Sequence, residues 1–297
     1  MATKYKAPLG ASLVVLSSLF YASYGVWTKL MGDYFDGFTS TVFRSLFVIL
    51  ALVPVVLVTK SWVKINWRRD GKYLAGMLIA SSLVWGPLYY AILKLGVGVS
   101  AAVNYGAIII GMFLFGWLLA HEKFTKDKLL SSVLGLVGLA LVFVNHSMSF
   151  SILPLFAATI SGIAIAASMV IAKQIPYSGT QSTIILWSAS LLSSIALSGI
   201  FQVKVPVFEF KIEWLYLVMF SLASLVASWT FVRGTKLIDA GAAGVLGLLE
   251  IVFGVLFGII IFSERPGGLV LLGALVIIAA ATVPYLKYYN AKRETFG

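Results

Sequence analysis

The chain has 297 residues, of which 60% are hydrophobic and only 11% are charged. Soluble domains carry about 25% charged residues, so this composition excludes a water-soluble protein and indicates a membrane protein. The net charge of +11 does not indicate nucleic-acid binding, because the cytoplasmic loops of membrane proteins carry an excess of Lys and Arg. The chain contains no cysteine, which excludes disulfides and thiolate metal sites.

Ten apolar stretches are each long enough to cross a bilayer as a helix, which needs about 20 residues. The first is too long for the apolar part of a signal peptide, so we expect it to be retained. The runs do not alternate with period two, which excludes a membrane β-barrel. The sequence therefore predicts an all-α membrane protein with spans near 8–30, 38–58, 73–93, 97–119, 128–145, 150–173, 181–202, 213–236, 240–262 and 268–289.

The charges of the loops predict the orientation of these spans. With the N-terminus inside, 15 Lys and Arg residues fall in inner segments and 5 in outer segments. Cytoplasmic loops are enriched in Lys and Arg. Both termini are therefore predicted to be cytoplasmic, in a multi-pass protein of the cytoplasmic (inner) membrane.

One phrase of the sequence occurs twice. "FGWLLAHEKF" at 115–124 returns as "FGIIIFSERP" at 257–266, and "SLVWGPLYYAILKLG" from Ser82 matches "SLVASWTFVRGTKLI" from Ser224 at the same offset of 142. The chain is thus predicted to hold two five-helix repeats, 1–147 and 148–297. Because five is odd, the second repeat enters the membrane upside down. Inverted repeats are typical of secondary transporters that work by alternating access.

The chain also resembles a known family, the drug/metabolite transporter superfamily, and in particular its ten-helix EamA-type members. The resemblance rests on Glu122 and Glu264 at the ends of the fourth and ninth spans, on Arg44, on Gly135 and on "LLE" at 248–250. It implies transport of amino acids, drugs, sugars or nucleotide sugars through a cavity lined by helices one, three, four, six, eight and nine. The sequence departs from the family where a proline is common: it has Ile108 and Ile109 in the fourth span and Ile251 in the ninth.

Ionisable side chains inside spans are costly and mark function by default. Glu250 lies near the middle of the ninth span, where it is predicted to bind substrate or a proton; the alternative is a neutral carboxyl bonded to a neighbouring helix. Arg233 and Trp229 share a face of the eighth span, and Arg233 is a candidate for holding a carboxylate. Its alternative is to reach the membrane surface with its charge. For Arg44 the resemblance implies a structural role, pairing with a neighbour or bonding carbonyls.

Aromatic and polar side chains near the middle of the third and fourth spans complete the predicted substrate site. Trp85 and Tyr89 share one face of the third span, and Asn104 lies on the fourth. Aromatic rings there would hold a ring or a cationic amine. The alternative for the aromatic residues is a lipid-facing or interfacial position.

The remaining charged residues and motifs carry no predicted chemistry. Glu122 and Glu264 lie at the two water interfaces, where we expect them to cap helices or form ion pairs. The Lys residues at helix ends are also expected to be structural, because cations are favourable near helix C-termini. "HEKFT" at 121–125 lacks the second His of a metalloprotease motif, and no catalytic set or phosphate-binding loop is found. The sequence predicts no enzyme, no cofactor and no metal.

These observations predict a secondary transporter that moves a small organic solute, an amino acid or amine, and exports it. Glu250 and a proton would supply the coupling, and the protein would be a monomer or weak dimer. A nucleotide-sugar or phosphorylated-metabolite antiporter is one alternative. A membrane scaffold without solute flux is the other.

Overall fold

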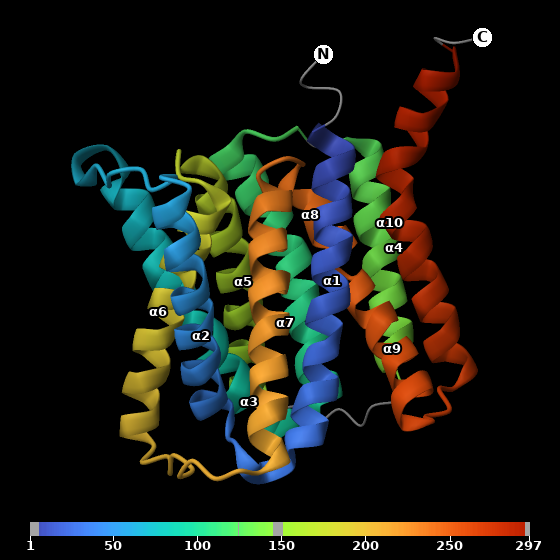
Figure 1. The fold of residues 1–297 in the computed structure, drawn as a ribbon. Coiled ribbons are helices and arrows are strands. Elements are labelled where there is room, and N and C mark those ends of the chain that lie inside the picture. The colour runs from blue at the N-terminus through green and yellow to red at the C-terminus, as the bar shows by residue number, and fades with distance from the viewer. Residues whose placement is uncertain (1–5, 124, 145–150, 295–297) are drawn as a thin grey trace.

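The computed structural model describes residues 6–123, 125–144 and 151–294, with side chains up to residue 283. Every regular element in these ranges is a helix, and the helices run alongside one another as a bundle (Figure 1). α1 begins and α10 ends at the upper end of the bundle in Figure 1. The elements are α1 (Lys6–Met31), the 3₁₀ turn η1 (Gly32–Tyr34), α2 (Gly37–Val58), α3 (Trp67–Ala120), α4 (Lys126–Phe143), α5 (Ile152–Gln174), α6 (Gly179–Ile200), α7 (Ile212–Thr235), α8 (Ala240–Gly247), α9 (Leu249–Phe262) and α10 (Gly268–Glu294).

Seven stretches of the described chain are long and apolar enough to cross a membrane, and a shorter apolar stretch, Gly268–Val283, lies in α10. Large apolar side chains remain exposed along the helices, among them Leu50, Leu192 and Ile260. In water this surface would aggregate, whereas lipid tails cover it without cost. The protein is therefore a multi-pass integral membrane protein.

Polar residues mark where several helices begin. The Asp36 carboxylate accepts bonds from the amides of Phe38 and Thr39 at the start of α2. Thr125 and Ser178 do the same for α4 and α6. Such N-caps satisfy amides that have no partner within the helix, and they place the loops at the ends of the apolar runs.

The predicted spans 73–93 and 97–119 lie within the single 54-residue element α3. An uninterrupted helix of that length would be about 80 Å long, far more than a bilayer requires. Gly96 interrupts it with φ 79° and ψ 167°, a backbone conformation that glycine adopts readily. Near one end of α3, Asp70 accepts a bond from Tyr177, and just past the other end Glu122 pairs with Lys173. Lys173 lies in the last turn of α5 and Tyr177 just past its end, so both ends of α3 lie on the same side of the bundle and α3 turns back at Gly96.

The predicted span 240–262 is divided into α8 and α9 at Leu248. The Leu248 amide bonds the carbonyl of Val245, and the Ile251 amide bonds the carbonyl of Leu248. These i→i−3 bonds tighten the helix for one turn. Glu250 lies within this tightened segment, in the first turn of α9.

Helices approach each other closely where both carry small residues. Gly138 of α4 faces Gly273 of α10, and a Cβ on either would come within 3 Å of the other's carbonyl oxygen. Gly162 of α5 lies against α3, where a Cβ would collide with the Asn104 carbonyl oxygen and come within 2.7 Å of the Ala107 side chain. Small residues of this kind are the usual means of close helix packing in membranes.

Gly162→Val is expected to lower stability by roughly 1–3 kcal/mol, the usual cost of overpacking a tight contact. A melting curve of the purified protein in detergent would measure the loss. Gly25→Ala is the matched control, because a Cβ at Gly25 of α1 meets no atom within 4 Å and alanine favours a helix by about 1 kcal/mol over glycine. Equal melting temperatures for the two variants would contradict this account of the α3–α5 contact.

Candidate functional site

Glu250 lies midway along the Ala240–Phe262 stretch, partly buried at the start of α9. The Tyr105 hydroxyl of α3 donates a hydrogen bond to its carboxylate. Glu250 also interacts electrostatically with Tyr21 and Tyr24 of α1. A carboxylate in this position has three phenol groups from two other helices in its electrostatic surroundings, and it can bind a proton or a cationic group.

Arg44 of α2 is the most enclosed cation described, with 2% of its surface exposed. Its Nε donates to the Ser40 carbonyl at 3.3 Å and its Nη2 to the Thr41 hydroxyl at 2.9 Å. These bonds agree with the expected carbonyl-bonding role. They leave Nη1 without a hydrogen-bond partner, and within the described ranges no carboxylate forms an ion pair with Arg44.

Aromatic rings from four helices surround this guanidinium. The guanidinium carbon lies 4.1 Å from the ring centre of Phe220, 4.8 Å from Trp85 and 5.2 Å from Tyr24, with Trp187 at 5.9 Å. Cations are attracted to ring faces within about 6 Å. The rings hold the charge in place without neutralising it.

Two tyrosines lie near both Arg44 and Glu250. The rings of Tyr21 and Tyr24 meet edge to face with centres 5.2 Å apart, and both interact electrostatically with Arg44 as well as with Glu250. We call Tyr21, Tyr24, Arg44, Tyr105 and Glu250 the central cluster. It contains one cation from α2, one carboxyl group from α9 and three phenol groups.

The sequence-predicted residues of the third and fourth spans fall in different places. Trp85 contacts Arg44 and so borders the central cluster. Tyr89 packs edge to face on Phe38 at 4.9 Å, at the start of α2. The Asn104 amide donates to the Ala158 carbonyl of α5 at 3.2 Å, so its side chain ties two helices together.

Trp229 and Arg233 lie together, as their spacing predicts. The guanidinium of Arg233 lies 4.6 Å from the Trp229 ring centre, and the Trp229 indole donates to the Thr180 hydroxyl of α6 at 2.9 Å. Arg233 is exposed in the last turn of α7, and among the described residues no ion pair joins it to Glu250. Of the six predicted site residues, Trp85 borders the central cluster and Glu250 belongs to it. The other four lie outside the cluster, at separate places in the bundle: Tyr89, Asn104, and Trp229 with Arg233.

The sequence analysis did not include Arg44, Tyr21, Tyr24 or Tyr105 in the site. Arg44 carried a usable signal, because an arginine within a span is costly unless it has a function. For the tyrosines, sequence spacing shows which residues share a face of one helix. It does not show which faces of separate helices meet.

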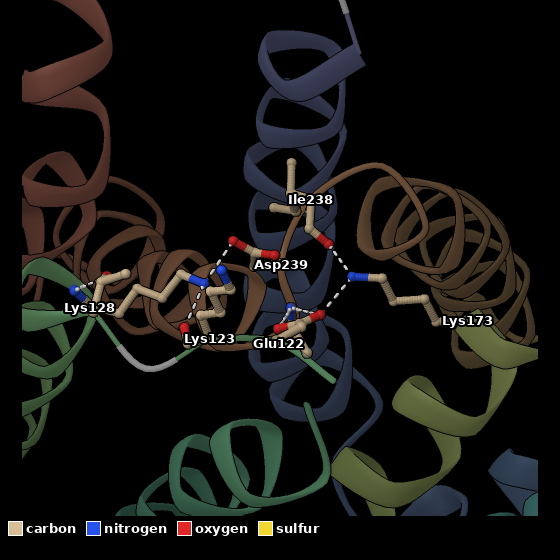
Figure 2. A network of polar contacts seen from close by, with 8 residues as sticks. Glu122, Lys123, Lys128, Lys173, Ile238 and Asp239 are labelled. Atoms are coloured by element: carbon tan, nitrogen blue, oxygen red, sulfur yellow. Dashed lines mark hydrogen bonds and ion pairs between the residues drawn. The ribbon is translucent and has the colours of Figure 1, made fainter. Parts of the chain in front are cut away.

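At the end of the bundle where α1 begins, a network of polar contacts joins the end of α5, the start of α8 and the residues after α3 (Figure 2). Lys173 Nζ lies 2.6 Å from Glu122 Oε1 and 2.6 Å from the Ile238 carbonyl oxygen. Glu122 also accepts the Ala240 amide at 2.8 and 3.0 Å, and therefore caps α8. Beside it, Lys128 pairs with Asp239 at 2.7 Å. Only 11% of the Glu122 side chain and 19% of the Lys173 side chain are exposed.

The lower end carries a second pair of the same kind. Lys29, in the last turn of α1, lies 2.7 Å from Glu264, which follows α9. Both side chains are 55% exposed. As the sequence analysis expects, Glu122 and Glu264 both form ion pairs. Their backbones also match, because each amide bonds a glycine carbonyl six residues earlier at 3.0 Å. We call Lys173–Glu122 the upper pair and Lys29–Glu264 the lower pair.

Comparison with known protein families identifies the family of this chain. The model of the EamA-like transporter family matches residues 8–144 and again residues 152–285. The chain belongs to the EamA-like transporter family. This confirms the resemblance to drug/metabolite transporters and a general role in solute transport, and the family is one of transporters rather than enzymes.

Individual EamA relatives are distant but cover most of the chain. An "Uncharacterized transporter" of Helicobacter pylori (strain J99 / ATCC 700824) is 22% identical over 84% of this chain and 85% of its own. "Solute carrier family 35 member G1" of Homo sapiens is 22% identical over 93% and 80%. The "S-adenosylmethionine uptake transporter" of Rickettsia prowazekii (strain Madrid E) is 25% identical over 86% and 85%.

A solved crystal structure shares the fold. It covers 93% of this chain and 98% of its own chain with a TM-score of 0.77 and 17% sequence identity. At that identity the likeness extends to the arrangement of the helices and not to the substrate.

Proposed function

We propose that this chain is a secondary transporter of ten membrane helices in two inverted repeats, 1–147 and 148–297. The boundary between them, at 147–148, lies outside the described residues. The repeat is supported by the two family matches, by the turn in α3 at Gly96 and by the equivalent backbone bonds at Glu122 and Glu264. It moves a small organic solute by alternating access.

The observation that carries this proposal is the carboxyl group of Glu250 inside the bundle, beside a one-turn tightening of its helix. A membrane-buried carboxyl is expensive, and helix irregularities in transporters usually lie where substrate or ion binds. Glu250 holds either a proton or the cationic group of a solute, so the two compete for one site. That competition couples solute movement in one direction to proton movement in the other.

The upper and lower pairs form the two closures that alternating access needs. Each pair joins a lysine of one repeat to a glutamate of the other, at opposite ends of the bundle. Opening a path to either side requires one pair to separate. The upper pair is the more enclosed, so the described conformation is closed more firmly at the upper end.

The proposed substrate carries an amino group near aromatic rings, as amino acids and amines do. The name of the Rickettsia relatives extends this class to S-adenosylmethionine, which has an amino-acid part and a sulfonium cation. The excess of Lys and Arg in one set of loops supports cytoplasmic termini in an inner membrane. Export and a monomeric or weakly dimeric state remain predictions of the sequence.

Solute flux in sealed proteoliposomes tests this function. Vesicles loaded with amino acids, amines, sugars, nucleotide sugars and S-adenosylmethionine are followed by mass spectrometry, with and without a pH gradient. We expect selective efflux of the amine-bearing solutes, accelerated by the gradient. Efflux of nucleotide sugars alone would favour the antiporter alternative, and no efflux from folded protein would contradict the transporter proposal.

A further inference from the structure

The most unusual group in the bundle is the guanidinium of Arg44. It is almost fully enclosed, with 2% exposure. It donates to Ser40 and Thr41 on its own helix, and its one further hydrogen-bonding neighbour in the described ranges is the neutral Tyr24 hydroxyl of α1. Removing a charge from water costs several kcal/mol unless an opposite charge compensates it. The aromatic rings around Arg44 recover part of this cost. They provide no anion.

The unpaired nitrogen indicates what is missing. Nη1 is buried and donates no hydrogen bond, although a guanidinium presents five N–H groups in a fixed plane. A carboxylate matches that plane and accepts two parallel bonds from it. No described acidic group forms an ion pair with Arg44, and Glu250 only shares with it the neighbours Tyr21 and Tyr24. An anion from outside the chain is therefore the natural partner.

We propose that Arg44 is the receptor for the carboxylate of the transported solute, and that Glu250 receives its ammonium or sulfonium group. This rests on the proposed transport function and narrows it to zwitterionic solutes with an α-amino-acid head. The two tyrosines of α1 interact electrostatically with both charged groups and would line the solute. We thus assign the carboxylate of the solute to Arg44 and not to Arg233, the candidate of the sequence analysis.

The surroundings of Arg44 suit a site that must bind and then release its ligand. A permanent salt bridge would hold the arginine in one place and leave no donor free. Aromatic faces fix the plane of the guanidinium instead. The Trp187 ring is itself held by its indole bond to the Ser228 hydroxyl at 2.8 Å. The free donor is thus positioned before the solute arrives, which lowers the cost of binding.

Matched solutes with and without a carboxylate test this assignment. The probes are S-adenosylmethionine with its decarboxylated form, tyrosine with tyramine, and lysine with cadaverine. Their affinities are measured by melting shifts of the purified full-length protein. We expect at least one carboxylate-bearing probe to bind about 30-fold or more tighter than its partner, since losing one member of a desolvated charge pair has that effect.

Variants then assign the preference to a residue. Arg44→Lys keeps the charge but not the two parallel donors, so the preference is expected to fall by about tenfold or more. Arg44→Gln should abolish it. A ligand-free melting temperature and a size-exclusion profile close to those of the wild-type protein show that each variant is folded. Arg233→Lys tests the competing assignment and should keep the preference.

Three outcomes would overturn the inference: no carboxylate preference in the wild-type protein, a preference that survives Arg44→Lys, or a preference lost in Arg233→Lys instead. The transport proposal is judged separately, by the flux of tyramine and cadaverine, which do not need Arg44. Flux of tyramine and cadaverine without any carboxylate preference would overturn the Arg44 assignment and leave the transport proposal standing. Absence of flux of every solute would count against the transport proposal itself.

Discussion

Glu250→Gln is expected to reduce transport by about 30-fold or more and to remove its dependence on a pH gradient. Glutamine keeps the size of the side chain and can still accept the Tyr105 bond. It can neither release a proton nor pair with a cation in a site shielded from water. Losing one member of a desolvated charge pair costs about 2–5 kcal/mol, which corresponds to this reduction. Flux of an amine-bearing solute in proteoliposomes measures it.

Two comparisons make this result specific. Glu209→Gln removes an exposed carboxylate that pairs with Lys211 in the α6–α7 loop, and it should transport as the wild type does. Tyr105→Phe removes one hydrogen bond from Glu250 and leaves its charge, so a loss of about two- to tenfold is expected. Gradient-driven transport by Glu250→Gln at the wild-type rate would contradict the assignment of Glu250 as the site that binds the proton and the solute cation.

Glu122→Gln is expected to destabilise the protein by about 2–4 kcal/mol. Glu122 accepts bonds from Lys173 and from the amide of Ala240 at the start of α8, where a negative charge also favours the helix dipole. Removing one partner of an enclosed ion pair leaves the other uncompensated. The unfolding free energy, measured by titration with a denaturing detergent, gives the size of the effect.

Glu264→Gln is the matched control for this prediction. Glu264 and Lys29 form an equivalent pair with half of each side chain in solvent, and exposed pairs contribute less than about 1 kcal/mol. We therefore expect the loss in Glu122→Gln to be at least about twice that in Glu264→Gln. Equal losses would mean that the difference in exposure has no energetic consequence, and that the upper end is not the firmer closure.

The apolar spans could be predicted from the sequence because length and hydropathy alone determine them. The all-helical character, the multiple membrane crossings and the family follow from the same information. The turn at Gly96 was implied by the boundary between two predicted spans. The division at Leu248 was not, because "GVLGLL" at 244–249 is apolar throughout and its hydrogen-bond register depends on the helices packed around it.

The composition of the central cluster could be predicted only in part. Glu250 stands out as an acid within a span, and its contact with Tyr105 could not be inferred because α3 and α9 are far apart in sequence. Asn104 is a polar residue at mid-span, yet its amide bonds the Ala158 carbonyl. For Arg44 the resemblance to the family favoured a structural role, and its bond to the Ser40 carbonyl agrees with that expectation. Its unpaired nitrogen is visible only once four other helices surround it.

The central claim is that the two ends of the bundle open in turn, and cysteine cross-linking tests it most directly. The chain has no native cysteine, so pairs can be introduced at Lys29 and Glu264 for the lower end and at Lys128 and Asp239 for the upper end. A short reducible bis-methanethiosulfonate then joins each pair. The account predicts that either cross-link alone stops flux in proteoliposomes and that reduction restores it. Continued flux with either end verifiably cross-linked would contradict alternating access in this protein.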